Sequence, residues 1–503
     1  MNAMSEKTTL GLEILGAATV LGVSGDLLLR ATPWGLNALL CTAGLVAAAA
    51  YIVHRHGIAV SADALWLAVA ILLLASNFTA RDSMALRALD SIGLAILCCL
   101  ACLSLRGVAI RGLHAWEYVQ AGLAAAVGAC VGAFALVGRD VRWEELPSGG
   151  ALRHLRAVGA GTLLALPLLL VFGGLFASAD AVFGNVLAGA FDIDFGAVAS
   201  HTFLIACGTT LAGGVLWSAL LRAVAQPTGG PGRGFSLGIV PVGTALGLLD
   251  ALFLLFVVIQ LRYFFGGTDL IQRTTGLTYA EYARRGFFEL VAASALVLPI
   301  LLAADWAVRN EAPQQRRTFR SLAGLLILLL AVVMASALER MRLYVDQFGL
   351  SEVRLYATAF MVYLAAVFVW FGWTVLREQR RRFAVGALVQ GFAVLGGLHL
   401  LNPDALIVRT NIDRPAVHHP FDAGYAASLS ADAVPDLLAA LPRLEDTERC
   451  RAARGLLSRW TAGGARAVED GWRNWNLARA RARRAVREQA ASLGALTCKQ
   501  SPR

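Results

Sequence analysis

Lysine is nearly missing from this sequence of 503 residues, and its scarcity excludes several kinds of chemistry. Of the 44 basic residues, only Lys7 and Lys499 are lysines. A P-loop nucleotide site, a protein kinase and a Schiff-base enzyme each need a lysine inside the fold. Because both lysines lie near the ends of the chain, ATP-driven pumps and pyridoxal enzymes are excluded. We expect no bound cofactor.

Charge of either sign is also scarce, and this indicates a membrane protein. Charged residues make up 16% of the chain and hydrophobic residues 57%, with a mean hydropathy of +0.63. A membrane-spanning helix needs about 20 apolar residues. We count twelve such runs, at residues 8–25, 31–53, 58–80, 89–105, 115–138, 157–179, 195–221, 235–261, 286–304, 321–338, 356–376 and 383–401. Continuous runs of this length predict an all-α fold, a polytopic transmembrane helical bundle. The first run carries Glu13 and no cleavage site follows it, so we expect a retained helix.

Composition divides the chain into five parts. Transmembrane spans are expected at 1–138, 139–221 and 235–401, with a turn-rich cytoplasmic linker at 222–234 and a polar tail at 402–503. The tail predicts a small helical domain outside the membrane. Apolar residues recur at helical spacing in it, at Val468, Trp472, Trp475, Ala482, Val486 and Leu493. Two alternatives remain open for this stripe: it packs inward within the domain, or it lies on an anionic membrane surface.

The distribution of arginine predicts the orientation of the second half of the chain. Loops 139–156, 222–234, 306–320 and 377–382 hold 14 arginines, whereas the loops on the other side hold seven. Cytoplasmic loops retain basic residues, so the tail is expected to face the periplasm. The first half is nearly balanced, and the side of the N-terminus stays open.

The eight cysteines fall into two groups. Cys450 and Cys498 lie in the tail, where an oxidising compartment would let them form a disulfide. The other six lie in apolar runs and are expected to be inert thiols. Cys98, Cys99 and Cys102 have no second pair of ligands to complete a tetrahedral site, so no metal is expected.

Ionisable residues inside spans are costly, and each one is a functional candidate. Most lie near span ends and can cap a helix or reach water: Glu13, Asp26, Asp63, Asp90 and Glu117. His201 and His399 are isolated, which favours ordinary hydrogen-bonded histidines over haem ligands. Asp250 differs because it lies mid-span between apolar turns. It must face the interior of the bundle.

A second group of candidates lies in two outer loops. Glu281, Arg285 and Glu289 are spaced four apart, so on a helix they share one face with alternating charge. The full set of candidate ligand-binding residues is Asp250, Arg262, Tyr263, Tyr279, Glu281, Arg284, Arg285, Glu289, Arg340, Arg342 and Tyr344. Three interpretations remain open: an ion-pair network that joins helix ends, an outward-facing cavity for a phosphate or carboxylate ligand, or acid-base catalysis by Glu281 or Glu289.

Several strings in this region resemble a known family. They are LRYFFGG at 261–267, YAEYARRGFFEL at 279–290, RMRLY at 340–344, NPDA at 402–405 and WNLAR at 475–479. In their residues and their order, these strings resemble a bacterial family of multi-spanning membrane proteins that is defined only by a domain of unknown function. The resemblance covers roughly residues 150–490. The resemblance implies a bacterial inner-membrane location. It brings no reaction, ligand or catalytic residue.

Three function hypotheses follow. The first is a transporter or ligand-responsive envelope component with Asp250 as a buried acidic switch. The second is a membrane enzyme acting on a lipid-linked or anionic substrate, with Glu281 or Glu289 as base. The third is a structural protein whose tail recruits a periplasmic partner. The expected contacts are the lipid bilayer and an anionic small molecule or lipid headgroup, and no nucleic acid is expected, because the basic residues are divided between the tail and the loops.

Overall fold

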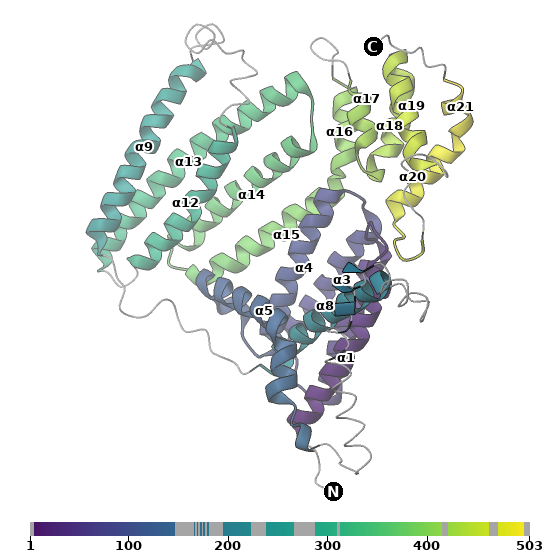
Figure 1. The fold of residues 1–503 in the computed structure, drawn as a ribbon. Helices are drawn as coiled ribbons and strands as arrows, with labels where there is room; N and C mark the ends of the chain where they lie inside the picture. Colours follow the sequence, from purple (N-terminus) through teal and green to yellow (C-terminus); the bar gives the residue numbers. More distant parts are fainter. Residues whose placement is uncertain are drawn as a thin grey trace.

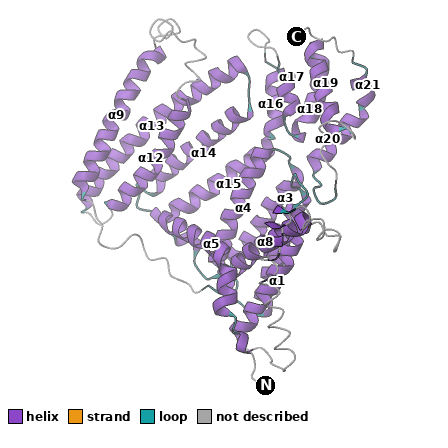
Figure 2. Ribbon diagram, in the orientation of Figure 1, coloured by secondary structure: helices purple, strands orange, loops and turns teal. Residues whose placement is uncertain are grey.

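The computed structural model describes residues 5–145, 195–222, 238–265, 287–308, 312–414, 421–461 and 471–496, with a few positions between 165 and 180. Every element longer than a turn in these ranges is a helix (Figure 2). The predicted all-α fold is therefore confirmed for the part of the chain that the structure describes.

Eleven helices in the described ranges are long and apolar enough to cross a membrane. The first six are α1 (Glu6–Leu29), α2 (Leu36–Arg55), α3 (Ala62–Ala80), α4 (Met84–Leu105), α5 (Ala115–Ala135) and α8 (Phe195–Leu220). The other five are α9 (Ile239–Phe265), α12 (Phe287–Ala307), α13 (Pro313–Phe348), α14 (Glu352–Thr374) and α15 (Phe383–Leu401). They correspond to eleven of the twelve predicted spans. The remaining one, at 157–179, lies largely outside the described residues.

The spanning helices form two groups (Figure 1). One group contains α1 to α5 and α8, and the other contains α9, α12, α13 and α14, while α15 lies between them and contacts both α4 and α14. A helix that is apolar on all sides can be stable only where lipid or other helices surround it. This chain is a multi-pass integral membrane protein.

The first group is packed through small residues. A Cβ added to Gly22 of α1 would lie 2.1 Å from the hydroxyl oxygen of Thr209 on α8, and one added to Gly214 would lie 2.1 Å from the carbonyl oxygen of Ala129 on α5. Small residues let helix backbones approach closely, which is how packing stabilises helices in lipid. Substitutions at these glycines would separate the helices.

The second group is packed through large side chains. Leu330 of α13, Leu301 of α12 and Phe371 of α14 are almost fully buried in one core. In contrast, α9 packs mainly against α13, and leucines on its other faces, such as Leu248 and Leu252, are 68% and 60% exposed. This helix is the most peripheral of its group.

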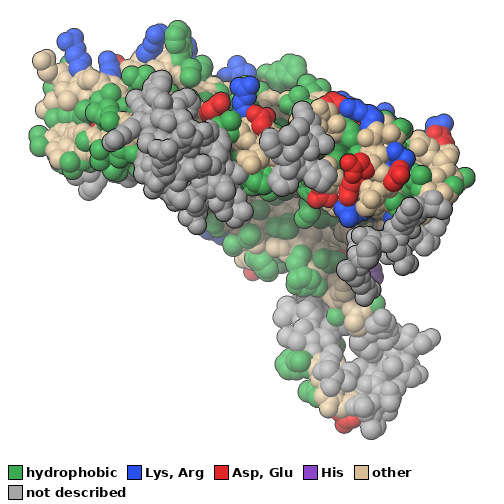
Figure 3. Space-filling model, turned by 90° about the horizontal axis from the view of Figure 1, so that it is seen from above, with side chains coloured by type: hydrophobic (Ala, Val, Ile, Leu, Met, Phe, Trp, Pro, Cys, Tyr) green, Lys and Arg blue, Asp and Glu red, His purple; other side chains and the backbone are tan. Residues whose placement is uncertain are grey.

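The described residues from 403 onward form a group of helices at one end of the bundle (Figure 1), and their apolar core is continuous with side chains of α3, α4, α14 and α15. Its helices are α16 (Pro403–Ile412), α17 (Ala423–Ser428), α18 (Val434–Ala440), α19 (Asp446–Trp460), α20 (Leu477–Glu488) and α21 (Ala490–Gly494). We call it the C-terminal domain. Acidic and basic side chains alternate over its outer face (Figure 3), as expected for a surface in water.

The predicted apolar stripe of the tail is only partly a helix face. Ala482, Val486 and Leu493 are buried in the domain core. Trp472 and Trp475 are 66% and 44% exposed, because the helix begins only at Leu477, after Asn476 caps it. Val468 lies outside the described residues.

The described cysteines fall into the two groups predicted from the sequence. Cys41, Cys98, Cys99, Cys102, Cys130 and Cys207 are free thiols. Cys450 is buried on α19 and is disulfide-bonded. Cys498 lies outside the described residues, so the pairing of these two cysteines stays a prediction.

Candidate functional site

Two neighbouring cavities lie at the turn between α13 and α14, the first between these helices and α12 and the second between the turn and the C-terminal domain. The first has a volume of about 290 Å³ and the second about 220 Å³. Ser351 and Arg354 line both. The first is also lined by Phe287, Phe288, Met341, Tyr344 and Val353. The second extends to Asn411, Arg414, Asp422 and Tyr425 of the C-terminal domain. We call the pair the Arg354 cavities.

A tight turn between α13 and α14 positions this site. Helix α13 ends at Phe348 and is capped by Gly349, whose φ of +81° is in the region that favours glycine. The side chain of Asn411 then fixes the next residue: its Oδ1 accepts from Leu350 N at 2.6 Å, and its Nδ2 donates to Leu350 O at 2.8 Å. The turn is thereby tied to α16, so the C-terminal domain holds one wall of the cavities in place.

Two guanidinium groups converge on the second cavity. Arg354 lies with its Cζ 4.0 Å from the ring centroid of Tyr344 and donates to the carbonyl oxygen of Gly349. Arg414 reaches the same turn and donates to Val345 O at 3.4 Å. Burial lowers the pKa of Arg414, the nearby charge of Arg354 lowers it further, and Asp346 opposes both effects. Two like charges held near one cavity are the arrangement that an anion stabilises.

A buried carboxyl lies close to the same region. Asp404, in the first turn of α16, has no exposed surface, and its Oδ1 has no hydrogen-bond partner. Its Oδ2 accepts from Ser430 N at 3.2 Å. Burial raises the pKa of Asp404 to about 6, and the charges of Glu352 and Asp432 act in the same direction. This group changes its charge within the physiological range.

The structure places only some of the predicted site residues near these cavities. Tyr344 lines the first cavity, and Glu289 is exposed on α12 beside the lining residues Phe287 and Phe288. Arg340 and Arg342 lie on α13 just before Tyr344, half-buried and exposed respectively. Arg262 and Tyr263 belong to the last turn of α9, but their side chains lie outside the described residues, as do Tyr279, Glu281, Arg284 and Arg285 entirely.

Asp250 lies elsewhere. It is 5% exposed on α9, facing α13, as its mid-span position predicts. Gln260 of α9 accepts from Ser336 of α13, and Gly243 lies beside Leu322, so Asp250 is level with residues 326–329 of α13. Tyr344 is at least 15 residues further along that helix, which corresponds to roughly 20 Å. Asp250 is therefore no part of the Arg354 cavities.

The carboxylates that lie near span ends have partners. Asp26 accepts from Arg30 Nε at 2.7 Å and lies 2.5 Å from His201 Nδ1, and Asp90 lies 2.9 Å from His399 Nε2. Glu13 pairs with Arg55 at 2.7 Å, Asp63 pairs with Arg111 at 3.1 Å, and Glu117 accepts from the backbone N of His114 at 2.7 Å. Of the roles predicted for these acids, helix capping is confirmed for Glu117. The predicted access to water is wrong for Asp26 and Asp90, which are 4% and 1% exposed and have arginine or histidine partners instead, because an unpaired carboxylate is costly inside a span.

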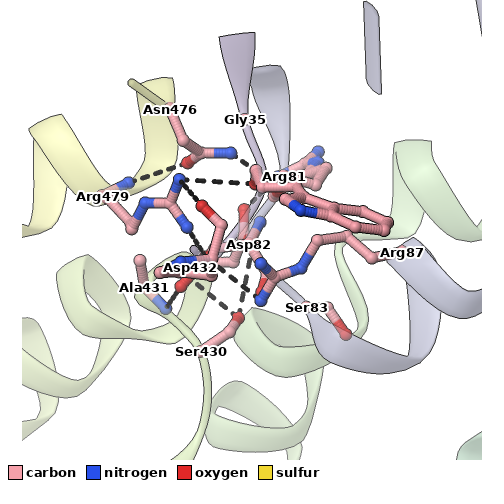
Figure 4. A network of polar contacts seen from close by, with 12 residues as sticks. Gly35, Arg81, Asp82, Ser83, Arg87, Ser430, Ala431, Asp432, Asn476 and Arg479 are labelled. Carbon is pink, nitrogen blue, oxygen red and sulfur yellow. Dashed lines mark hydrogen bonds and ion pairs between the residues drawn. The ribbon is translucent and has the colours of Figure 1, made fainter. Parts of the chain in front are cut away.

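Sequence reasoning missed one polar cluster, which joins the bundle to the C-terminal domain (Figure 4). Arg479 of α20 is 1% exposed, and its Nη1 lies 2.8 Å from Asp82 Oδ1 in the turn between α3 and α4. Asp82 N in turn donates to Asp432 Oδ2 at 2.7 Å, and Arg81 Nη1 pairs with Asp432 Oδ1 at 3.1 Å. We call these residues, with Asn476, the polar junction.

Asn476 completes the polar junction. Its Nδ2 donates to the carbonyl oxygens of Phe78 and Arg81, both at 2.8 Å, while its Oδ1 accepts from Arg479 N at 3.0 Å. Burial lowers the pKa of Arg479, and Asp82 opposes that shift. Buried charges persist only where partners satisfy them. The one signal in the sequence was the string at 475–479, which identifies the residues but not their partners.

The fold and these sites define a polytopic helical membrane protein. Over residues 68–440 the sequence matches a family described as Domain of unknown function (DUF4153), and the chain belongs to that family. The predicted family resemblance is thus confirmed. No curated protein and no solved structure shows a significant match.

Proposed function

We propose that this protein is a transporter or ligand-responsive component of the bacterial inner membrane that binds a small anion in the Arg354 cavities. The observation that carries the proposal is the convergence of Arg354 and Arg414, from the bundle and from the C-terminal domain, on one hollow. Guanidinium groups match the geometry of phosphate and carboxylate oxygens. The ligand is therefore a phosphate or carboxylate group, either of a small solute or of a lipid headgroup.

The location of the site supports a ligand-responsive role. Arg354 belongs to α14 of the bundle, and Arg414 follows α16 of the C-terminal domain. A ligand that contacts both would connect the bundle to this domain, in addition to the existing link through the turn at Gly349. A ligand that binds one arrangement more tightly shifts the population toward it. The enzyme alternative has no such support, because Glu289 is exposed and Glu281 lies outside the described residues.

Binding can be tested by ligand-induced stabilisation of the full-length protein in detergent. Inorganic phosphate or a short-chain phosphatidate at about 100 times its Kd should stabilise by about 2.7 kcal/mol, which raises Tm by several degrees. Arg354→Gln should abolish the shift. Arg342→Gln is the matched control, because this arginine is exposed on α13 and lines neither cavity.

The two probes separate the sources of the anion. A shift with phosphate alone identifies a soluble ligand, whereas a shift that needs the phosphatidate identifies a lipid headgroup. If neither probe stabilises the protein, or if Arg354→Gln responds like the wild type, the anion site is wrong.

The proposed orientation has the C-terminal domain in the periplasm. The arginine-rich turn at Arg380–Arg382 lies at the end of α15 opposite that domain (Figure 1), which supports a cytoplasmic position for it. The disulfide at Cys450 supports an oxidising compartment for the domain. A reporter active only in the periplasm, fused after Arg503, should be active, and a cytoplasm-specific reporter at the same position should be silent. The reverse pattern would overturn this orientation.

A further inference from the structure

We propose that Asp250 is a proton-binding site inside the membrane-embedded bundle, whose carboxylate takes up one proton to become a neutral carboxylic acid and releases it again. This inference goes beyond the anion site and does not depend on it. It starts from a contrast with the five acids described above: Glu13, Asp26, Asp63, Asp90 and Glu117 each have a basic, histidine or backbone partner, whereas Asp250 has none among the described residues. Both of its carboxyl oxygens are buried without a hydrogen-bond partner among the described residues.

The register of α9 and α13 shows what surrounds this carboxyl. Ser336 of α13 donates to Gln260 of α9, and a Cβ added to Gly243 would lie 3.8 Å from Leu322. The two helices are therefore parallel, with equivalent positions 76 to 79 residues apart. Asp250 is level with residues 326–329, where Leu326 and Leu329 are buried in the shared apolar core.

No charge in the described neighbourhood balances an ionised Asp250. Residues 321–338 of α13 contain no titratable side chain, and charged residues occur on that helix only up to Arg320 and from Glu339 onward. On α9 the next charge is Arg262, twelve residues or roughly 18 Å away. On α12 the acids are Glu289 at its start and Asp305 at its end, the latter paired with Arg380 at 2.7 Å.

These surroundings fit the neutral acid far better than the anion. An unpaired carboxylate in an apolar interior loses its hydration with no compensating partner, whereas a carboxylic acid loses much less. Proton uptake is the simplest change that removes the charge. A metal cation would need several oxygen ligands together, but residues 326–329 of α13, level with Asp250, are leucine and isoleucine and offer no side-chain oxygen.

A small residue leaves room beside the carboxyl. An added Cβ at Gly247, one turn before Asp250, would meet no atom within 4 Å. No described side chain therefore packs on α9 at Gly247, while the carboxyl of Asp250 itself is buried. A small apolar reagent can reach α9 from this side, one turn from the carboxyl.

Dicyclohexylcarbodiimide, which couples to protonated carboxyl groups in apolar surroundings, tests the site directly. The full-length protein in native lipid is treated over a range of pH, and labelled peptides are identified by mass spectrometry. Asp250 should be the main labelled residue, and its labelling should fall about tenfold per pH unit once the group is mostly ionised. Asp250→Asn should remove the label.

Asp305 supplies the matched control. It is buried to a similar extent, with 7% exposed, but it is paired with Arg380 and should stay ionised and unlabelled. Asp305→Asn should therefore leave the labelling of Asp250 unchanged. Equal labelling of Asp250, Asp305 and Asp90 would overturn the proposal, and so would protection of Asp250 by Na⁺ at constant pH, which indicates a metal site.

Infrared difference spectroscopy between low and high pH provides a second readout that needs no reagent. The wild type should show the carbonyl stretch of a buried protonated carboxyl, and Asp250→Asn should lack it. If neither labelling nor this band depends on Asp250, the proton site is absent. This outcome leaves the phosphate-binding result unaffected, so the two proposals fail separately.

Discussion

The C-terminal domain is attached to the two groups of helices in different ways. Against the first group it makes the polar junction, in which Arg479, Asp82 and Asn476 are buried and satisfied. Between the domain and the second group lies the second of the Arg354 cavities, which Arg354 and Arg414 line. A buried contact made of ion pairs resists rearrangement, whereas a contact that contains a cavity can accept a ligand. The difference indicates that buried ion pairs anchor the domain to the first group, whereas its contact with the second group, held by Asn411 at Leu350, leaves room for a ligand.

Removal of Arg479 should produce the largest loss of stability. Arg479→Ala leaves the carboxylate of Asp82 buried, with Arg87 at 3.5 Å as its one ion-pair partner among the described residues. Loss of one partner of a buried pair costs about 3–5 kcal/mol. Thermal unfolding of the full-length variant in detergent measures this loss.

Arg484→Ala is the control for this prediction. Arg484 belongs to the same helix but is exposed, and it pairs only with the exposed Glu488 at 3.0 Å. Its replacement should leave Tm nearly unchanged. If both variants unfold alike, the polar junction does not anchor the domain, and the contrast with the Arg354 cavities disappears.

A smaller, pH-dependent effect on stability should arise at Asp404, which lies near the Arg354 cavities. Its pKa of about 6 in the folded protein is higher than in the unfolded chain, so the folded state holds the proton more tightly. The stability that this proton provides is present below about pH 4 and is lost as pH rises through about 6.

Asp404→Asn should therefore stabilise the protein above pH 6 by roughly 1–3 kcal/mol and remove this part of the pH dependence. Asparagine keeps an oxygen that can accept from Ser430 N. Tm measured between pH 4 and 8 checks the sign. A variant that is less stable than the wild type at pH 8 would show that the charged form of Asp404 is the one the fold requires.

The sequence was sufficient to predict features that depend on local pattern. Apolar runs predicted the spans, and the position of Glu117 at the start of a span predicted its capping role. The burial of Asp250 followed from its apolar flanks alone. In each case the cost of an unsatisfied polar group in lipid restricts the outcome without knowledge of distant partners.

The contacts of the C-terminal domain could not be predicted in this way. Asp82 and Arg479 are 397 positions apart, and Leu350 and Asn411 are 61 positions apart. No periodicity relates such residues, because tertiary packing alone brings them together. The candidate set drawn from the outer loops included Tyr344 but omitted Arg354 and Arg414, since a lone arginine near a helix end resembles any other basic loop residue.

The separation within the polar junction also sets an order of events during synthesis. Asp82 leaves the ribosome 397 residues before Arg479. At about 5–20 residues per second, the interval is roughly 20 to 80 seconds. During this time the turn after α3 has only water and its neighbour Arg87 to solvate the carboxylate. The junction therefore closes last, once the chain is almost complete, and a nascent protein that stops before α20 would carry an open acidic turn at the membrane surface.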